Sequence, residues 1–148
     1  MTTADPDFDV ERMRIAIEHA RMSRPSPNPP VGALVVDVKG ERVATAHHQA
    51  AGEEHAEVAA LRAAGDAAKG GALYVTLEPC NHEGKTAPCV DAILASGIKR
   101  VVIGCTDPNP HVRGGGAERM REAGLDVVVG VCGSEARQLI APWAKYIT

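Results

Sequence analysis

The chain has 148 residues, of which 45% are hydrophobic, 24% are charged and 3% are aromatic, and its formal net charge is −3. These values predict one globular domain over residues 1–148 and argue against a nucleic-acid partner, which would call for a basic surface and aromatic side chains for stacking. The acidic N-terminus lacks the features of a signal peptide and no apolar run is long enough to span a bilayer, so we expect a cytoplasmic protein with no membrane partner.

Apolar spacing and the positions of chain-breaking residues predict the elements in chain order. The first is a helix over 10–22, which ends at a proline-rich loop. Two apolar runs within 31–46, separated by Lys39 and Gly40, are typical of a β-hairpin. Helices and strands then alternate: a helix over 56–68, a strand over 72–77, a helix over 89–95, a strand over 100–105, a helix over 117–123, a strand over 125–131 and a helix over 135–141.

This alternation predicts an α/β fold. Strands joined by helical crossovers pair in parallel and are buried on both faces, which fits their continuous Val and Ile runs. Together with the antiparallel hairpin, they predict a mixed sheet with helices on both sides. Ligands of such open sheets collect beyond the carboxyl ends of the strands. The segments LEPC (77–80) and TDPNP (106–110) follow two of these ends.

The residues best suited to chemistry are His55 and Glu57 of the segment HAE, together with Cys80 and Cys89. A reducing cytoplasm disfavours a disulfide between the two cysteines, although either one taken alone is most often a small core residue. One imidazole and two thiolates make three zinc ligands and leave the fourth tetrahedral position open for water, whose pKa zinc can lower to about 7. We therefore expect one zinc ion, held by His55, Cys80 and Cys89.

Glu57 is the candidate proton carrier. A separation of two residues makes side chains diverge inside a regular helix, but His55 and Glu57 can converge if His55 stands at the helix start. The carboxylate could then move a proton from water to a leaving nitrogen. The order of HAE, a strand, PC at its end and a second PC opening the next helix is shared with zinc nucleobase deaminases, except that eight residues, not two, separate the cysteines.

Longer segments, among them SPNPPVGALVV, YVTLEPCNHEGKTAPCVDAIL and DPNPHVRGGG, resemble the deaminase domain of the bacterial riboflavin biosynthesis enzyme, diaminohydroxyphosphoribosylaminopyrimidine deaminase. The resemblance covers about residues 12–136, and the pattern PCxHxGxTxPC is its most specific part. It implies a three-layer α/β/α sandwich of the cytidine deaminase type with a mixed five-stranded sheet. It also implies a zinc ligand role for His55, Cys80 and Cys89, a proton-shuttle role for Glu57, and a homo-oligomer, either a dimer or a tetramer.

The same resemblance assigns substrate contacts, whose side chains suit a pyrimidine nucleotide with a 5′-phosphate. The matching positions are Asn28, His48, His82, Lys85, Thr86, Asp107 and Asn109. The implied reaction is zinc-dependent hydrolytic deamination of the small molecule 2,5-diamino-6-ribosylamino-4(3H)-pyrimidinone 5′-phosphate. Without the resemblance, Lys85 would be an ordinary surface lysine, and Asp107 and Asn109 would form an ordinary proline-flanked turn.

Two alternatives stay open. Members of the family commonly continue into a reductase domain, which we do not expect within residues 1–148, and Pro30 and Ile140 depart from the family's usual residues. These departures leave room for a deaminase acting on another nucleobase or nucleotide. A different class is a non-catalytic zinc-binding module, in which His82 would close the site as a fourth protein ligand. We expect Cys105 and Cys132 to be structural thiols, because neither has a ligand partner nearby in the sequence.

Overall fold

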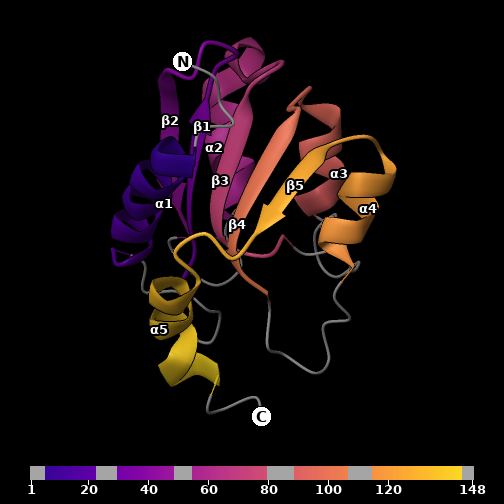
Figure 1. Cartoon of the computed structure of the whole chain (residues 1–148). Helices are drawn as coiled ribbons and strands as arrows, with labels where there is room; N and C mark the ends of the chain where they lie inside the picture. Colours follow the sequence, from indigo (N-terminus) through magenta and orange to yellow (C-terminus); the bar gives the residue numbers. More distant parts are fainter. Residues whose placement is uncertain (1–5, 23–29, 49–54, 80–88, 107–114, 145–148) are drawn as a thin grey trace.

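The computed structural model describes residues 6–22, 30–48, 55–79, 89–106 and 115–144. Their elements follow the predicted order (Figure 1). The helices are α1 (Pro6–Ala20), α2 (Ala56–Ala64), α3 (Cys89–Ala95), α4 (Gly116–Glu122) and α5 (Gly133–Ala144), with a short 3-10 turn η1 (Gly65–Ala68) directly after α2. The strands are β1 (Gly32–Val36), β2 (Arg42–His47), β3 (Ala72–Leu77), β4 (Arg100–Cys105) and β5 (Asp126–Val129).

The strands form one mixed sheet in the order β2-β1-β3-β4-β5. The hairpin strand β1 pairs antiparallel with both β2 and β3, whereas β3, β4 and β5 are parallel, as the alternation of helices and strands predicts. Every residue of β1, β3 and β4 is buried, which is expected of central strands covered on both faces. The predicted mixed five-stranded sheet is therefore confirmed.

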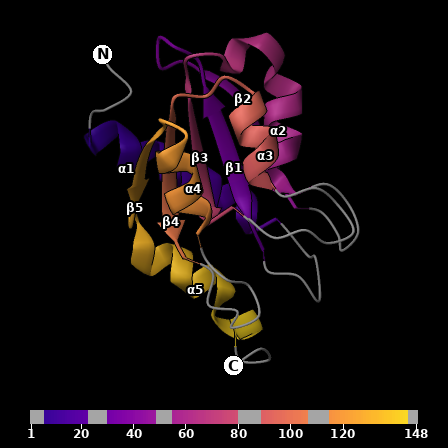
Figure 2. The same ribbon diagram turned by 90° about the vertical axis from the view of Figure 1, so that its right-hand side faces the viewer.

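Helices cover both faces of this sheet, so the predicted three-layer α/β/α architecture is confirmed (Figure 2). On one face, α2, α3 and α4 pack on the larger core, which includes Leu61, Ile93 and Met120. On the other face, α1 packs through Met13 and Ile17 on the side chains of β1, β3 and β4. Helix α5 lies beside α1 and β4 near the carboxyl ends of the parallel strands (Figure 1).

Several helix ends differ from the predicted ones. Helix α1 begins at Pro6 rather than at residue 10, because proline is tolerated in a first turn, where its missing N–H would have no partner. Helix α2 ends at Ala64 rather than at 68, since Gly65 takes a positive φ of 56°. Helix α5 continues through Pro142 to Ala144, three residues beyond the predicted end, with the proline in its last turn.

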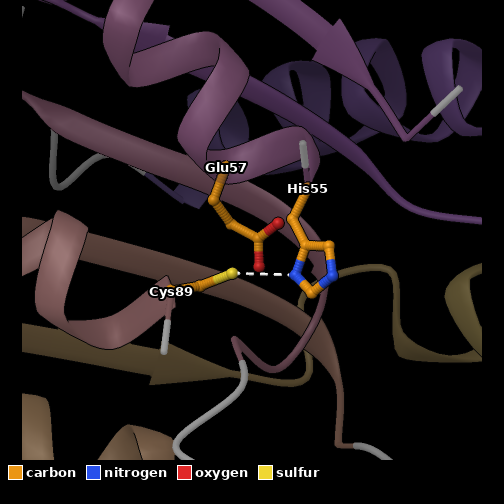
Figure 3. Close-up of side chains that lie close together, drawn as sticks. All are labelled: His55, Glu57 and Cys89. Atoms are coloured by element: carbon orange, nitrogen blue, oxygen red, sulfur yellow. Dashed lines mark hydrogen bonds between the residues drawn. The ribbon is translucent and has the colours of Figure 1, made fainter. Parts of the chain in front are cut away.

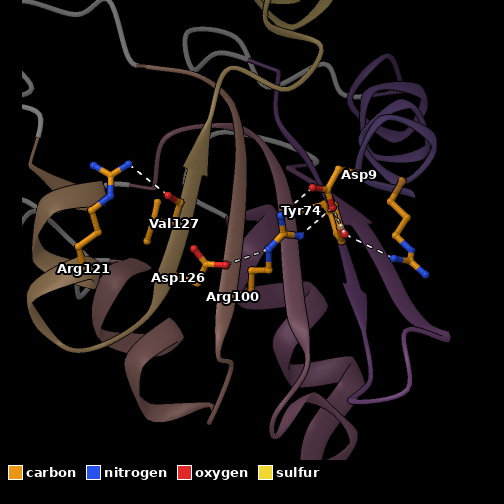
Figure 4. Close-up of polar contacts among 7 residues, drawn as sticks. Asp9, Tyr74, Arg100, Arg121, Asp126 and Val127 are labelled. Atoms are coloured by element: carbon orange, nitrogen blue, oxygen red, sulfur yellow. Dashed lines mark hydrogen bonds and ion pairs between the residues drawn. The ribbon is translucent and has the colours of Figure 1, made fainter. Parts of the chain in front are cut away.

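A buried polar network fastens α1 to the sheet (Figure 4). The Arg100 guanidinium donates two hydrogen bonds of 2.7 Å to the two carboxylate oxygens of Asp9 and a third, of 3.2 Å, to Asp126 Oδ2. The Tyr74 hydroxyl donates to Asp9 Oδ1 at 2.6 Å. Asp9 and Arg100 are only 4% and 7% exposed, so this ion pair lies inside the protein.

The two thiols outside the predicted metal site take structural positions. Cys105 is buried in a small cluster with Leu77, Ala136 and Ile140, and its Sγ lies 3.6 Å from the carbonyl oxygen of Thr76. Cys132 is half-buried beside α1. Among the described helices, none has the length and apolarity required to cross a membrane.

Candidate active site

Three side chains with metal-binding or acid–base capability meet between α2 and α3. His55, Glu57 and Cys89 converge on one point, with His55 and Glu57 coming from the start of α2 and Cys89 from the start of α3 (Figure 3). One ligand atom from each of them lies within 4.8 Å of the others. This cluster stands at the carboxyl-end side of the parallel strands, where the α/β pattern predicts the site.

The backbone at the start of α2 explains why His55 and Glu57 converge. His55 is the N-cap residue, with extended angles φ −68° and ψ 156°, and its carbonyl oxygen accepts the Ala59 N–H at 3.0 Å. Its side chain therefore leaves the main chain in a direction that a regular helical residue could not take, while Glu57 sits in the first helical turn. The predicted position of His55 at the helix start is confirmed.

Cys89 is the first residue of α3, and its Sγ lies 2.9 Å from His55 Nδ1. Cys89 and Glu57 are 2% and 4% exposed, so both residues are largely shielded from bulk water. The amide dipoles at the start of α3 favour an anionic sulfur at this position.

A second imidazole adjoins the cluster. His48 directly follows β2, is 3% exposed, and places its ring 5.1 Å from the His55 ring at an interplanar angle of 81°. Its backbone N–H donates to the carbonyl oxygen of Val31 at 3.0 Å, which continues the pairing of β1 and β2 beyond the ends of the strands. Among the substrate contacts expected from the sequence, His48 is thus brought next to His55.

The donor set fits zinc. Zinc favours imidazole nitrogen and thiolate sulfur with bonds of about 2.0–2.3 Å, so the ligand atoms of one ion gather within a few ångströms of one another. The His55 nitrogen and the Cys89 sulfur meet that requirement, and Cys89 is buried while His55 is partly buried. The Glu57 carboxylate is close enough either to bind the metal or to exchange a proton with water beside it.

The remaining predicted site residues lie outside the described residues. Cys80, the second predicted sulfur ligand, follows directly after the described residue Pro79. The other predicted contacts outside the described ranges are Asn28, His82, Lys85, Thr86, Asp107 and Asn109.

The sequence does not predict one hydrogen bond near the site, between Glu78 and Ala117. The Glu78 carboxylate accepts the backbone N–H of Ala117 at 3.1 Å, and this joins the end of β3 to the start of α4. No sequence signal announces the contact, because the two residues are 39 positions apart and the acceptor's partner is a main-chain amide.

Comparison with known proteins decides the family. The family model described as the cytidine and deoxycytidylate deaminase zinc-binding region matches residues 6–105. The chain belongs to the cytidine and deoxycytidylate deaminase family. Within that family it is 50% identical over 113 residues to the diaminohydroxyphosphoribosylamino-pyrimidine deaminase of Buchnera aphidicola subsp. Schizaphis graminum, with 76% of each protein covered. The resemblance to the riboflavin biosynthesis deaminases is thereby confirmed.

Longer relatives in this deaminase family match the chain over part of their own length. It is 51% identical over 144 residues to the riboflavin biosynthesis protein RibD of Aquifex aeolicus, which covers 96% of this chain and 40% of the relative. The solved structure of Acinetobacter baumannii RibD, form 2, matches with a TM-score of 0.91 and 40% identity, again over 96% of this chain and 40% of the other. The chain thus spans about two fifths of the length of these two proteins.

Proposed function

We propose that this chain is a zinc-dependent deaminase that hydrolyses the amino group of 2,5-diamino-6-ribosylamino-4(3H)-pyrimidinone 5′-phosphate, a step of riboflavin biosynthesis. The observation that carries the proposal is the convergence of His55 with the buried Glu57 and Cys89 in a chain of the deaminase family. A relative named for this pyrimidine deaminase is 50% identical to the chain, which supports the choice of substrate.

One zinc ion per chain is held by His55, Cys80 and Cys89. When bound, zinc would supply a polarised water molecule with a pKa lowered toward 7. Three protein ligands, rather than four, leave room for that water. The protein's contribution is to hold the nitrogen and sulfur ligands together in a shielded position, as the 2.9 Å separation of His55 Nδ1 and Cys89 Sγ illustrates.

Glu57 moves the protons. Deamination adds water to the amino-bearing ring carbon and breaks the carbon–nitrogen bond, so a proton must leave the water and another must reach the departing nitrogen. A single carboxylate can accept the first and donate the second if it reaches both atoms. Glu57 suits this task because it is 4% exposed and lies within the same cluster as His55 and Cys89.

The substrate is held by residues from several segments around this cluster. His48, next to His55, contacts the pyrimidine or ribose, while Lys85 and Thr86 bind the 5′-phosphate through charge and hydroxyl hydrogen bonding. Further polar contacts come from Asn28, His82, Asp107 and Asn109.

The deaminase unit comprises residues 1–148 and acts as a homo-oligomer, a dimer or a tetramer, in the cytoplasm, on a small-molecule nucleotide. These statements extend the family resemblance, and gel filtration with light scattering would test the assembly.

The central experiment compares Glu57→Gln with the wild-type protein and with Glu41→Gln, a matched change at an exposed residue of the hairpin. We expect Glu57→Gln to keep its zinc, measured by metal analysis, while ammonia release falls by at least about a hundredfold, the effect typical of a lost acid–base group. Glu41→Gln should match the wild type in both measurements. Undiminished ammonia release from Glu57→Gln would refute the proton-carrier role.

The same assay tests the substrate. We expect turnover of the pyrimidine nucleotide to drop steeply when its 5′-phosphate is removed. Equal turnover with and without the phosphate would favour a deaminase of another substrate. Bound zinc together with no ammonia release on either compound would favour a non-catalytic zinc module.

A further inference from the structure

We propose that the first turn of α4 is a brace for the metal site, and that Glu78 and Gly116 are positioning residues that hold the two sulfur-bearing segments at a fixed separation. The inference rests on the proposed zinc function. It concerns residues that bind neither metal nor substrate themselves. The brace consists of Gly116 and Ala117 of α4 in contact with Glu78 and Pro79 on one side and with Val90 on the other.

The first contact of the brace is made by Glu78, which lies two residues before Cys80. Its backbone N–H donates to the carbonyl oxygen of Cys105 at 2.9 Å, which continues the parallel pairing of β3 and β4 beyond the end of the strand. Its side-chain Oε2 accepts the Ala117 N–H at 3.1 Å. That amide belongs to the first helical turn, where backbone N–H groups have no partner within the helix. Glu78 is therefore fastened at both its main chain and its side chain.

The second contact of the brace is the close approach of Gly116, in α4, to Pro79. A Cβ atom on Gly116 would lie 2.5 Å from the carbonyl oxygen of Pro79, 3.5 Å from Cγ2 of Val90 and 3.6 Å from Cγ of Glu78. Pro79 immediately precedes Cys80, and Val90 immediately follows Cys89. Only glycine allows α4 to touch both segments at once, and any larger residue at position 116 would push against the Pro79 carbonyl.

A third contact links α4 to α3. Arg119 pairs with Asp91 at 2.5 Å, and Asp91 lies in the first turn of α3, two residues after Cys89. Both side chains are more than two fifths exposed, so we assign this ion pair a minor part in the brace. The pair nevertheless joins α4 to the first turn of α3, which is the turn that carries Cys89.

These contacts have a consequence for metal affinity. Ligands held in place before the metal arrives lose little freedom on binding, whereas loosely held ligands must be ordered at that moment, which weakens binding. Groups that orient ligands from behind typically change metal affinity by 10–100-fold when removed. The brace acts at this level, because Glu78 and the neighbours of Gly116, Pro79 and Val90, lie within two residues of Cys80 or Cys89 in the sequence.

The first test uses Glu78→Ala and Glu78→Gln, with Glu118→Ala as a matched control at an exposed glutamate of α4. Zinc dissociation constants are measured on metal-free protein by competition with a chelator, and unfolding of the metal-free protein is measured alongside. We expect Glu78→Ala to raise the zinc dissociation constant about 10–100-fold. Glu78→Gln should stay within a few-fold of the wild type because its amide oxygen can still accept the Ala117 N–H, and Glu118→Ala should not change it.

The second test compares Gly116→Ala with Gly133→Ala, since each glycine is buried and opens a helix. A Cβ at Gly133 would meet the tip of the Arg137 side chain at 3.0 Å and the Gly104 oxygen at 3.2 Å, away from both sulfur segments. We expect both variants to lower the stability of the metal-free protein, and only Gly116→Ala to weaken zinc binding. If Gly116→Ala does not fold, Glu78→Ala still decides the question.

The outcomes separate the brace from the proposed function. If Glu78→Ala lowers the stability of the metal-free protein but leaves its zinc dissociation constant at the wild-type value, Glu78 is merely structural and the brace is overturned. Wild-type protein that binds zinc but releases no ammonia would instead refute the deaminase proposal, and the zinc measurements would still decide the brace. Wild-type protein that binds no zinc would overturn both.

Discussion

The buried pair of Asp9 and Arg100 permits a quantitative prediction about how α1 is held to the sheet. Their side chains are 6% and 9% exposed and share two hydrogen bonds of 2.7 Å. At an effective dielectric constant of 20, opposite charges about 4 Å apart attract by roughly 4 kcal/mol, while desolvation costs several kcal/mol per ion. The pair as a whole therefore adds little net stability, but either charge left alone is costly.

We expect Arg100→Met and Asp9→Asn each to reduce the free energy of unfolding by about 3–5 kcal/mol, the cost of a buried charge without its partner. The double variant should be less destabilised than the sum of the two, with a coupling energy of about 2–3 kcal/mol. Because Asp9 raises the pKa of Arg100 still further above its ordinary range, the arginine stays charged throughout the pH range of the assay.

Urea unfolding of the four proteins measures this coupling, and hydrogen exchange reports whether the α1 amides open before those of the sheet. The exposed pair of Glu118 and Arg121, with side chains 70% and 44% exposed, serves as the control and should give less than about 1 kcal/mol. Strict additivity of Arg100→Met and Asp9→Asn would refute the reasoning, because it would mean that the two charges do not depend on each other.

Two further predictions concern the pH dependence of stability at Tyr74 and the cost of a side chain at two glycines, Gly32 and Gly124. Burial and the hydrogen bond to Asp9 raise the pKa of Tyr74, so above pH of about 10 the unfolded chain loses this proton before the folded one and stability falls as pH rises. Tyr74→Phe should flatten that decline in urea unfolding between pH 8 and 11, and an unchanged slope would contradict the assignment. Gly32→Ala should destabilise by about 3 kcal/mol or more, because its Cβ would lie 1.9 Å from the Ala16 carbonyl oxygen. Gly124→Ala meets nothing within 4 Å and should cost only the roughly 1–2 kcal/mol of its positive φ; thermal unfolding that ranks the two glycines in the opposite order would disprove this reasoning.

The sequence predicts the central elements well because breakers delimit them. The strands over 72–77 and 100–105 and the helix over 89–95 appear at their predicted bounds. Gly71 directly precedes β3 and Gly97 follows the end of α3, so each glycine indicates an element boundary. The convergence of His55 and Glu57 is also predictable, since it depends only on where α2 begins.

Helix ends and long-range contacts are less accessible from the sequence. Pro142 predicts an earlier end for α5, but a proline in a last turn removes only one hydrogen bond, and the helix continues. The partners of Asp9 and Glu78 stand 91 and 39 residues away, at Arg100 and Ala117. Local periodicity carries no information about such pairs, because they exist only once the sheet order brings their elements together.

The two ends of β4 contact different parts of the protein: the start binds α1, and the end lies beside the proposed metal site. Arg100, at the start of the strand, holds α1 through Asp9, while Cys105, at its end, receives the Glu78 N–H beside the metal site. Six strand residues place these two points about 17 Å apart. Changes more than about 10 Å apart with no shared partner are usually additive. Asp9→Asn should therefore lower the free energy of unfolding without changing zinc affinity in the folded protein. Glu78→Ala should change zinc affinity, because only Glu78 lies within two residues of a sulfur ligand.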